Sequence, residues 1–278
     1  MLGRVLSIAG SDSGGGAGIQ ADLKAITALG GFGMSAVTAL TAQNTCGVYG
    51  VHAVPVEFVR QQISVVLQDI GADCCKIGML GQAATVHAVA DTLVAYPALP
   101  LVLDPVMIAT SGASLMTSEG VLAVKERLLP RCQLVTPNIP EAEVLTSVTI
   151  TGLETMRRAA HVLLADGAGA VLLKGGHLPV SAGVASDELL DVLVLADGTE
   201  HIFRHPRLQT RHTHGTGCTL ASAVATGVAQ GAGLEAAVRR AIRYLQEALL
   251  TAPGLGRGNG PVNHGVSIAP AWATLSDL

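Results

Sequence analysis

Short, unbroken apolar runs alternate with longer amphipathic segments along most of this chain, and this alternation limits its folds more than any other feature. Strands are expected over residues 4–10, 33–40, 73–79, 99–106, 133–138 and 170–176, and helices over residues 18–29, 55–70, 83–95, 118–129 and 151–166. Apolar strands without polar alternation are buried on both faces, which requires a largely parallel sheet covered by helices on both sides. The sequence therefore predicts an α/β fold.

The pattern changes in the last third of the chain. Residues 189–208 are typical of two strands joined by an Asp-Gly hairpin turn. Two helices are expected after them, one beginning near Gly217 and one over residues 234–250. No linker, internal repeat or low-complexity segment divides the sequence, so we expect residues 1–278 to form a single domain.

Composition and charge exclude several classes of protein. Apolar residues make up 49% of the chain, which is enough to fill a large core. The apolar run over residues 86–107 contains His87, Asp91, Pro97, Pro100 and Asp104, so it does not provide the roughly 18–20 apolar residues that a membrane-spanning helix needs. The N-terminal apolar run is too short for a signal peptide, which predicts a cytoplasmic protein. Lys and Arg form no stripe, so we expect no nucleic-acid partner.

The five cysteines do not follow the spacing of a disulfide framework or a zinc site. Their number is odd, and no Cys-x-x-Cys sequence occurs. Cys74 and Cys75 lie in an apolar strand, where cysteine behaves as a small core residue. We therefore expect free thiols.

Ligands of such sheets bind beyond the carboxyl ends of the strands, so polar residues at these ends are the candidates for a site. The first strand runs into SDSGGGAGIQADLK, a glycine-rich loop that either approaches a ligand closely or is a flexible connector. Asp22, one turn into the following helix, is either solvated or turned inward to hold a donor group of a substrate. Gln43 ends the next strand, and its amide either caps the strand or suits a ring with an amino group beside a ring nitrogen.

Later strand ends carry candidates for a metal and phosphate site. Asp104, in LVLDPVM, faces the ligand crevice unless it only caps a turn. Asn138 and Glu141, in TPNIPEAE, either cap the short helix that follows or join Asp104 in the oxygen-rich set that Mg²⁺ prefers. Lys174 ends another buried strand before two glycines, which favours a point charge for phosphate oxygens.

The most specific signal is HGTGCT, residues 214–219, directly before a long apolar helix. The N–H groups of Gly217, Cys218 and Thr219 are expected to be unpaired there and to form an anion hole for a transferred phosphoryl group. The helix end is also expected to lower the pKa of Cys218 toward neutrality, so that its thiol takes or shares a proton from a substrate hydroxyl. The alternative is a small buried residue that closes the helix start.

With these residues in view, the chain resembles the ribokinase-like kinases, and among them the hydroxymethylpyrimidine/phosphomethylpyrimidine kinases of thiamin biosynthesis. The resemblance covers nearly the whole chain and is carried by IAGSDSGGGAGIQADLK, TALTAQNTCGV, KIGML, LDPVM, TPNIPEAE, LLKGGH, HTHGTGCTLASA and GNGPVNH. AQNT, KIGML and the cysteine of GTGC are specific to the pyrimidine kinases. The resemblance implies a ribokinase-like fold with a largely parallel central sheet, helices on both faces and no large lid domain.

The resemblance also implies an activity and roles for individual residues. The activity is ATP-dependent phosphorylation of 4-amino-5-hydroxymethyl-2-methylpyrimidine, and then of its monophosphate, by a homodimer that uses Mg²⁺. The residues implied to bind substrate are Gly10, Asp22, Gln43, Met79 and Val106, and those implied to bind ATP are Lys174 and Thr213. Those implied to act on the metal are Asp104, Asn138 and Glu141, and those implied to act in phosphoryl transfer are Gly215, Thr216, Gly217 and Cys218.

The chain departs from the wider class at two places. Most ribokinase-like enzymes carry an aspartate where this chain has Cys218, which leaves the general base open; phosphoryl transfer depends chiefly on positioning and charge neutralisation, so a weak base is tolerable. Residues 178–188 form a short polar stretch that is expected to be a mobile flap near the nucleotide.

Two other functions fit part of the pattern. A pyridoxal kinase phosphorylates the hydroxymethyl arm of a related ring with a similar site. A nucleotide-binding sensor without turnover is the second alternative, although the presence of Lys174, Glu141 and the GTGC turn together argues against it. A dinucleotide-dependent redox enzyme is disfavoured because the glycine loop does not have GxGxxG spacing.

Overall fold

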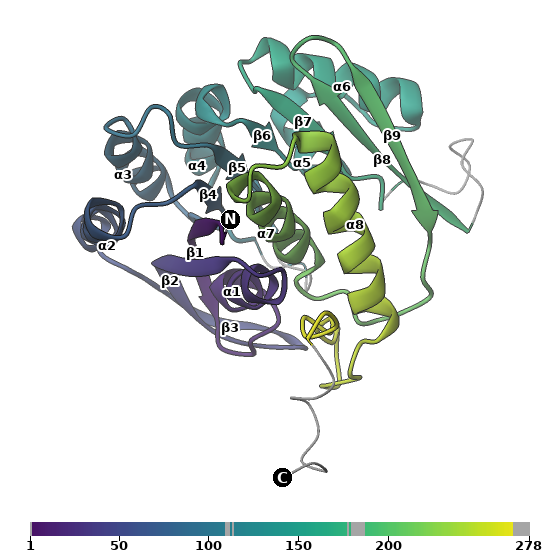
Figure 1. The fold of residues 1–278 in the computed structure, drawn as a ribbon, viewed down its shortest axis with the longest axis horizontal. Coiled ribbons are helices and arrows are strands. Elements are labelled where there is room, and N and C mark those ends of the chain that lie inside the picture. Colours follow the sequence, from purple (N-terminus) through teal and green to yellow (C-terminus); the bar gives the residue numbers. More distant parts are fainter. Residues whose placement is uncertain (1, 109–111, 113, 177, 179–186, 269–278) are drawn as a thin grey trace.

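The computed structural model describes residues 2–108, 112, 114–176, 178 and 187–268. Nine strands within these residues form one sheet, in the order β3-β2-β1-β4-β5-β6-β7-β8-β9 (Figure 1). The strands are β1 (Arg4–Asp12), β2 (Phe32–Asn44), β3 (Gly47–Ala53), β4 (Cys74–Ile77), β5 (Leu101–Leu103), β6 (Leu134–Val135), β7 (Ala170–Leu173), β8 (Glu188–Leu195) and β9 (Glu200–Pro206). β2, β1, β4, β5, β6 and β7 are neighbours in this order and pair in parallel. At the two edges of the sheet, β3 pairs antiparallel with β2, and β8 and β9 add two further antiparallel pairs. The predicted, largely parallel α/β sheet is confirmed.

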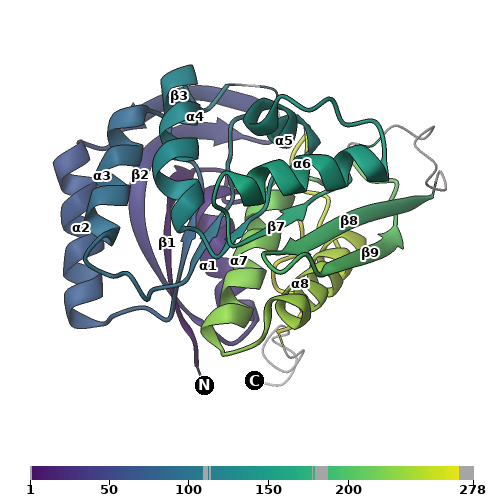
Figure 2. The same cartoon turned by 90° about the horizontal axis from the view of Figure 1, so that it is seen from above.

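Helices cover both faces of this sheet (Figures 1 and 2). One face packs against α1 (Gly18–Ala28), α7 (Thr216–Ala229) and α8 (Leu234–Leu250). The other face packs against α2 (Val56–Asp69), α3 (Ala83–Leu93), α4 (Ser118–Ala123), α5 (Ile139–Thr146) and α6 (Leu153–Ala165). The predicted two-sided covering is therefore present, and the described residues contain no separate lid domain.

Strand residues alternate between these two apolar layers. Val5 of β1 belongs to the layer with α1, α7 and α8, whereas Leu6 belongs to the opposite layer. Cys74 and Cys75 of β4 divide between the layers in the same way, and both are fully buried. Successive side chains of a strand point to opposite faces, so a doubly covered strand needs apolar residues at every position. The expectation of core cysteines is confirmed.

The structure differs from the sequence expectation at two elements. β2 continues to Asn44 and returns as β3, an antiparallel partner that the sequence did not predict. Most of the β3 side chains are exposed, so this strand lacks the apolar run that reveals a strand in a sequence. The helix expected over 118–129 changes character within its length, into a π-helical segment at Val124–Leu128 and a 3₁₀ turn at Leu129–Arg131.

The order of the strands fixes where a ligand can bind. β2 lies on one side of β1 and β5 lies beyond β4 on the other, so the connections that leave the carboxyl ends of β1 and β4 run in opposite directions. At such a switch point a crevice opens beyond the carboxyl ends of the strands. Most of the flap predicted over 178–188 lies outside the described residues. Among the described helices, none is both long enough and apolar enough for a membrane crossing.

Candidate active site

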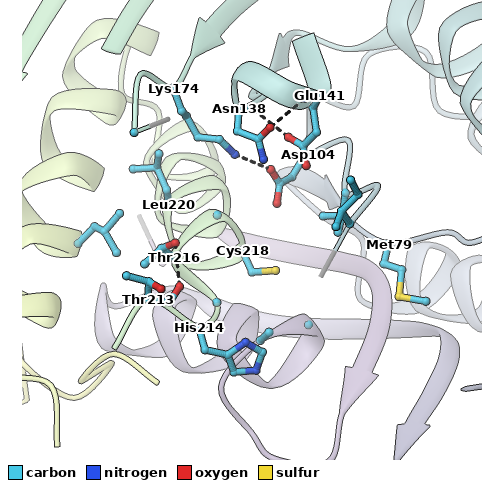
Figure 3. Close-up of a pocket in the computed structure, with 18 of the residues that line it drawn as sticks. Met79, Asp104, Asn138, Glu141, Lys174, Thr213, His214, Thr216, Cys218 and Leu220 are labelled. Atoms are coloured by element: carbon cyan, nitrogen blue, oxygen red, sulfur yellow. Dashed lines mark hydrogen bonds and ion pairs between the residues drawn. The ribbon is translucent and has the colours of Figure 1, made fainter. Parts of the chain in front are cut away.

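A pocket of about 730 Å³ opens at the carboxyl ends of the parallel strands (Figure 3). It is lined by every residue that the sequence analysis assigned to a site except Asp22 and Thr219. These residues are Gly10, Gln43, Met79, Asp104, Val106, Asn138, Glu141, Lys174, Thr213, Gly215, Thr216, Gly217 and Cys218. Gln43 and Lys174, which belong to opposite halves of the sequence, therefore face one cavity.

One end of the pocket combines an amide with apolar surface. Gln43 lies at the end of β2, and Gly10 lies in the neighbouring β1. Met79 follows β4 closely, and a Cβ atom added to Gly10 would lie only 3.1 Å from its sulfur. Val106 completes this part of the lining after β5. This end can hold a flat ring between apolar side chains and offer hydrogen bonds to its edge.

The other end is organised around Lys174 and Asp104. The Lys174 Nζ lies 3.1 Å from Asp104 Oδ1, which also accepts a hydrogen bond of 3.1 Å from the hydroxyl of Thr136. Burial alone would raise the pKa of Asp104, but the nearby ammonium of Lys174 holds it below its usual range. Burial likewise opposes the charge of Lys174, yet attraction to Asp104 keeps its pKa above normal. The pair therefore stays charged beside the cavity.

Asn138 and Glu141 start helix α5 with a reciprocal cap. The Glu141 N–H donates to Asn138 Oδ1 at 2.9 Å, and the Asn138 N–H donates to Glu141 Oε2 at 2.9 Å. This is a capping box, so the capping alternative is confirmed. Burial raises the pKa of Glu141 to about 7, because the attraction of Lys174 only partly offsets the loss of water and Asp104 adds repulsion.

The start of helix α7 leaves two donors free. Gly215 is the N-cap in the left-handed conformation, and the helix begins at Thr216. Among the described residues, the N–H groups of Gly217 and Cys218 have no hydrogen-bond acceptor. The prediction of a free N–H at Thr219 is wrong. This N–H donates to the Gly215 carbonyl at 2.9 Å, which is the first bond of the helix.

These free donors open beside the charged pair. A Cβ atom at Gly217 would lie 3.5 Å from the Lys174 Nζ and 3.6 Å from Asp104 Oδ2. Figure 3 shows the Cys218 sulfur between the Lys174–Asp104 group and His214. A helix start with free N–H groups next to a lysine is a site for phosphate oxygens.

The predicted low pKa of Cys218 is wrong. Burial raises the pKa of its thiol to about 11, although the positive charge of Lys76 acts in the opposite direction. The carboxylates of Asp22 and Asp104 add to the increase. Loss of water therefore outweighs the helix end at this position, and the thiol is neutral at pH 7.

The predicted contact between Asp22 and substrate is also wrong. Asp22 is fully buried under the pocket, and its carboxylate is engaged by the protein itself. Lys76, which is also fully buried, lies 2.9 and 3.1 Å from its two oxygens, and the hydroxyls of Ser7 and Ser222 donate at 2.6 and 2.7 Å. Burying a lysine requires such a partner, so Asp22 neutralises Lys76 rather than binding a ligand.

Asp12 and His214 are among the residues of the pocket wall that were not recognised in the sequence. Asp12 ends β1, and His214 precedes the glycine turn of α7; both are buried and line the cavity. The His214 Nε2 lies 2.8 Å from Asp12 Oδ2. Their positions at a strand end and next to GTGC were the available signals, but only the fold shows that they meet.

Known proteins resemble the chain over most of its length. The family profile described as phosphomethylpyrimidine kinase matches residues 12–263. A hydroxymethylpyrimidine/phosphomethylpyrimidine kinase of Bacillus subtilis is 47% identical over 262 residues, 94% of each chain. A thiamine biosynthesis bifunctional protein of Geobacter sulfurreducens is 54% identical over 263 residues, but the chain spans only 52% of that protein. The crystal structure of Bacillus subtilis pyridoxal kinase with ADP superposes with a TM-score of 0.85 at 31% identity, covering 96% of this chain and 98% of that one.

The similarity to a solved vitamin kinase over nearly the whole fold defines the class, which is that of the ribokinase-like small-molecule kinases. The profile match and the identity to curated relatives narrow it further. The chain belongs to the phosphomethylpyrimidine kinase family. It is therefore a phosphotransferase, and the alternative of a nucleotide sensor without turnover is not supported.

Proposed function

We propose that the protein transfers the γ-phosphoryl group of ATP to 4-amino-5-hydroxymethyl-2-methylpyrimidine and then to the resulting monophosphate, in thiamine biosynthesis. One observation carries this proposal: a ring-binding end with Gln43 and a phosphate-binding end with Lys174 belong to one pocket. The free helix start of α7 lies against the phosphate end. The names of the relatives support the same substrates.

The residues of the site supply binding and charge rather than covalent chemistry. We assign the edge of the pyrimidine to Gln43, and its faces to Met79 and Val106. In each transfer an oxygen of the acceptor attacks the γ-phosphorus while the bond to the bridging oxygen of ADP breaks. The free N–H groups at the start of α7 and the Lys174 ammonium hold the oxygens of the moving phosphoryl group, where negative charge must be stabilised.

Cys218 is proposed to contact the substrate hydroxyl as a neutral thiol. With its pKa raised to about 11, the thiolate is too rare at pH 7 to serve as the main base. The transition state of phosphoryl transfer is loose, so the hydroxyl proton need not leave before the oxygen–phosphorus bond forms. Thr213 lines the same pocket and is proposed to contact ATP.

The acidic residues of the phosphate end fit a magnesium ion. Two carboxylates, Asp104 and Glu141, line the pocket beside the Lys174 ammonium, and burial together with the charge of Asp104 raises the pKa of Glu141 to about 7. No group of three or more His, Cys, Asp or Glu side chains in the described part of the chain could hold a metal alone. Mg²⁺ commonly keeps waters and phosphate oxygens, so we propose that Asp104 and Glu141 hold it, with Asn138 acting through water. When bound, it neutralises phosphate charge.

Pyridoxal is the second candidate substrate, because the superposed pyridoxal kinase shares almost the whole fold. ADP formation with Mg-ATP separates the two. We expect kcat/KM for the aminopyrimidine alcohol to exceed that for pyridoxal at least tenfold, and we expect the monophosphate to be phosphorylated in turn. A higher kcat/KM for pyridoxal would show that the proposed substrate is wrong.

We also propose that residues 1–278 work as one kinase domain in a cytoplasmic homodimer. The continuous nine-stranded sheet of the described residues supports the single domain. The five free cysteines suit a reducing compartment. Exposed apolar side chains at Tyr49 and Val51 of β3 support a contact between two subunits. Sedimentation analysis tests the dimer.

A further inference from the structure

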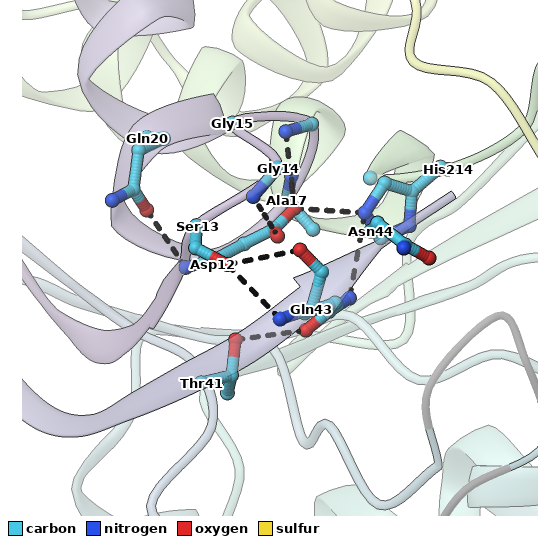
Figure 4. A network of polar contacts seen from close by, with 12 residues as sticks. Asp12, Ser13, Gly14, Gly15, Ala17, Gln20, Thr41, Gln43, Asn44 and His214 are labelled. Atoms are coloured by element: carbon cyan, nitrogen blue, oxygen red, sulfur yellow. Dashed lines mark hydrogen bonds and ion pairs between the residues drawn. The ribbon is translucent and has the colours of Figure 1, made fainter. Parts of the chain in front are cut away.

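Three consecutive residues at the end of β1 hold Gln43 (Figure 4). Ser13 holds the backbone of Gln43 by two hydrogen bonds: the Ser13 hydroxyl donates to the Gln43 carbonyl and accepts from the Gln43 N–H, both at 2.9 Å. Ser11 and Asp12 reach its side chain indirectly, each through one intermediate residue. The substrate-facing amide is therefore built into a network and is not free to rotate.

Asp12 reaches the amide through His214. Its Oδ2 accepts hydrogen bonds from the N–H groups of Gly16 and Ala17 at 3.0 and 2.8 Å, and lies 2.8 Å from the His214 Nε2. A carboxylate can only accept, so the His214 Nε2 carries a proton and donates it to Asp12. The same nitrogen lies 3.4 Å from the end of the Gln43 amide. That end of the amide therefore faces an N–H group.

Ser11 reaches the amide through Thr41. The Thr41 Oγ1 lies 2.9 Å from the Ser11 carbonyl oxygen and 3.1 Å from the other end of the Gln43 amide. The hydroxyl has one proton, and the carbonyl of Ser11 can only accept it. Thr41 must then accept a hydrogen bond from Gln43, which places the amide NH₂ at this end.

Both neighbours independently select the same orientation of the amide. In Figure 4 the amide nitrogen faces His214, which sets two donors against each other, and the oxygen faces Thr41, which leaves two acceptors for one proton. Exchanging the amide oxygen and nitrogen, a rotation of 180° about the last side-chain bond, removes both conflicts: the NH₂ then donates to Thr41, and the oxygen lies beside the His214 N–H, whose proton is donated to Asp12 at 2.8 Å and is shared with the amide oxygen only as a long second contact of 3.4 Å. Such amide assignments follow from the hydrogen-bond network.

We propose that Asp12 and His214, together with Thr41, are positioning residues that lock Gln43 with its oxygen toward His214 and its NH₂ toward Thr41, and so determine which ring edge the pocket accepts. This inference rests on the proposed function. Gln43 lines the cavity, so the lone pair and the N–H that its neighbours leave free would be offered to a ligand in a fixed order. An amino group beside a ring nitrogen matches that order, whereas a ring carbonyl beside a ring N–H reverses it and leaves donors and acceptors opposed.

The test compares the 4-amino substrate with its 4-oxo counterpart, in which a carbonyl replaces the amino group and the adjacent nitrogen carries a proton. The wild-type protein is expected to prefer the 4-amino compound at least 100-fold in kcat/KM. His214→Phe removes the N–H, Thr41→Val removes the hydroxyl, and each is expected to lower this preference about tenfold or more. The loss should fall mainly on the KM for the pyrimidine, with the KM for ATP within twofold of wild type.

Thr226→Val is the matched control. Thr226 is also a buried threonine, and its hydroxyl donates to the Ser222 carbonyl at 2.7 Å inside α7. This variant loses a buried hydroxyl of the same kind outside the pocket, so it should keep the wild-type preference. An unchanged preference in His214→Phe, Thr41→Val and the double variant would overturn the proposal.

The orientation itself is measured by NMR of the wild-type protein. Nuclear Overhauser contacts from the Gln43 side-chain NH₂ are expected to the Thr41 side chain, and contacts to the His214 ring instead would overturn the proposal. This measurement does not depend on the substrate. A preference for pyridoxal would therefore contradict the proposed function, while the NMR result still decides the orientation of Gln43.

Discussion

Lys174 is the cation on which the charge balance of the phosphate end depends. Its ammonium lies 3.1 Å from the buried Asp104 carboxylate and close to the free helix start of α7. Lys174→Met is expected to lower kcat/KM for ATP at least about 100-fold, because the transferred charge loses its partner and Asp104 is left unpaired. Lys125→Met is the control, since Lys125 pairs with Asp166 at the surface and should leave kcat/KM nearly unchanged. Equal activity of the two variants would contradict the assignment.

Cys218 tests how much the reaction depends on a base. Cys218→Ala is expected to lower turnover about tenfold or more, with a smaller effect on the KM for the pyrimidine. Because the pKa of the thiol is raised to about 11, the pH dependence of turnover between pH 6 and 9 should be the same in both proteins. Unchanged turnover would remove the cysteine from the mechanism, and a lost titration near pH 7 would show that the thiol acts as a base.

Nearly all of the site residues predicted from the sequence line the pocket, but the prediction erred where the surroundings of a residue come from distant segments. Asp22 lies on α1, yet its role is set by Lys76 of β4 and Ser222 of α7. The pKa of Cys218 depends on how deeply α7 is buried, which local sequence does not show. Residue type and spacing placed these side chains near the site; only tertiary contacts decide what each one touches.

The turn before helix α7 depends on a glycine that has no substitute. Gly215 has a φ of 79°, and a Cβ atom there would lie 1.8 Å from the Gly16 carbonyl oxygen, so the two glycine loops touch. Gly215→Ala is expected to lower the free energy of unfolding by roughly 2–3 kcal/mol and to abolish most activity. The loss of activity follows because the turn sets the direction of the free N–H groups.

Gly231→Ala is the control that shows how much of the effect at Gly215 comes from the contact with Gly16 and how much from the left-handed backbone conformation. Gly231 has a φ of 86°, but a Cβ atom there would meet nothing within 4 Å. Its substitution should cost only about 1 kcal/mol and leave kcat/KM unchanged. Urea denaturation measures both variants, and equal losses of stability would show that the contact between Gly215 and Gly16 is unimportant.

Elements were easier to predict when they are buried on both sides. The parallel strands and most helices follow from apolar runs and helical periodicity, and they lie where the sequence placed them. β3 was not predicted because most of its side chains are exposed, so its sequence has no apolar run. It forms a strand because it pairs antiparallel with β2. The cap formed by Asn138 and Glu141 was recognised as an alternative because a capping box has a sequence signature.

The end of the described chain returns to the active site and ties distant parts together. The His214 N–H donates to the Gly260 carbonyl at 3.1 Å, and the Gly258 N–H donates to the Thr45 hydroxyl at 3.2 Å. The motif GNGPVNH, which contains both glycines, therefore joins the start of α7 to the β2–β3 hairpin. Tyr244 of α8 fixes the end of the motif by donating to the His264 carbonyl at 2.7 Å.

His264 makes the stability of this arrangement depend on pH. Its Nε2 lies 3.0 Å from the Thr219 hydroxyl, which already donates to Gly215, so neutral His264 is the donor. Burial, with the positive charge of Lys24, lowers the pKa of His264 to about 4, so below pH 6.5 the unfolded chain takes up a proton that the folded protein does not. The contribution of neutral His264 to the free energy of unfolding is complete above pH 6.5 and is lost as the pH falls toward 4. Between pH 7 and pH 5 the free energy of unfolding is expected to fall by roughly 2 kcal/mol for this reason.

His264→Gln tests this dependence, because glutamine keeps an N–H donor but does not titrate. The free energy of unfolding, measured by urea at pH 7 and pH 5, should fall less in this variant than in the wild-type protein. His52→Gln, at an exposed position of β3, is the control and should behave as wild type. An equal fall in all three proteins would contradict the assignment to His264.

The whole account depends on one pocket holding the pyrimidine at Gln43 and the ATP phosphates at Lys174 and the start of α7. The most direct test is a crystal structure with 4-amino-5-hydroxymethyl-2-methylpyrimidine and a non-hydrolysable ATP analogue. It should place the γ-phosphate on the N–H groups of Gly217 and Cys218, with the substrate hydroxyl within about 3.5 Å of its phosphorus. A γ-phosphate bound away from the start of α7, or a pyrimidine ring bound away from Gln43, would contradict the account.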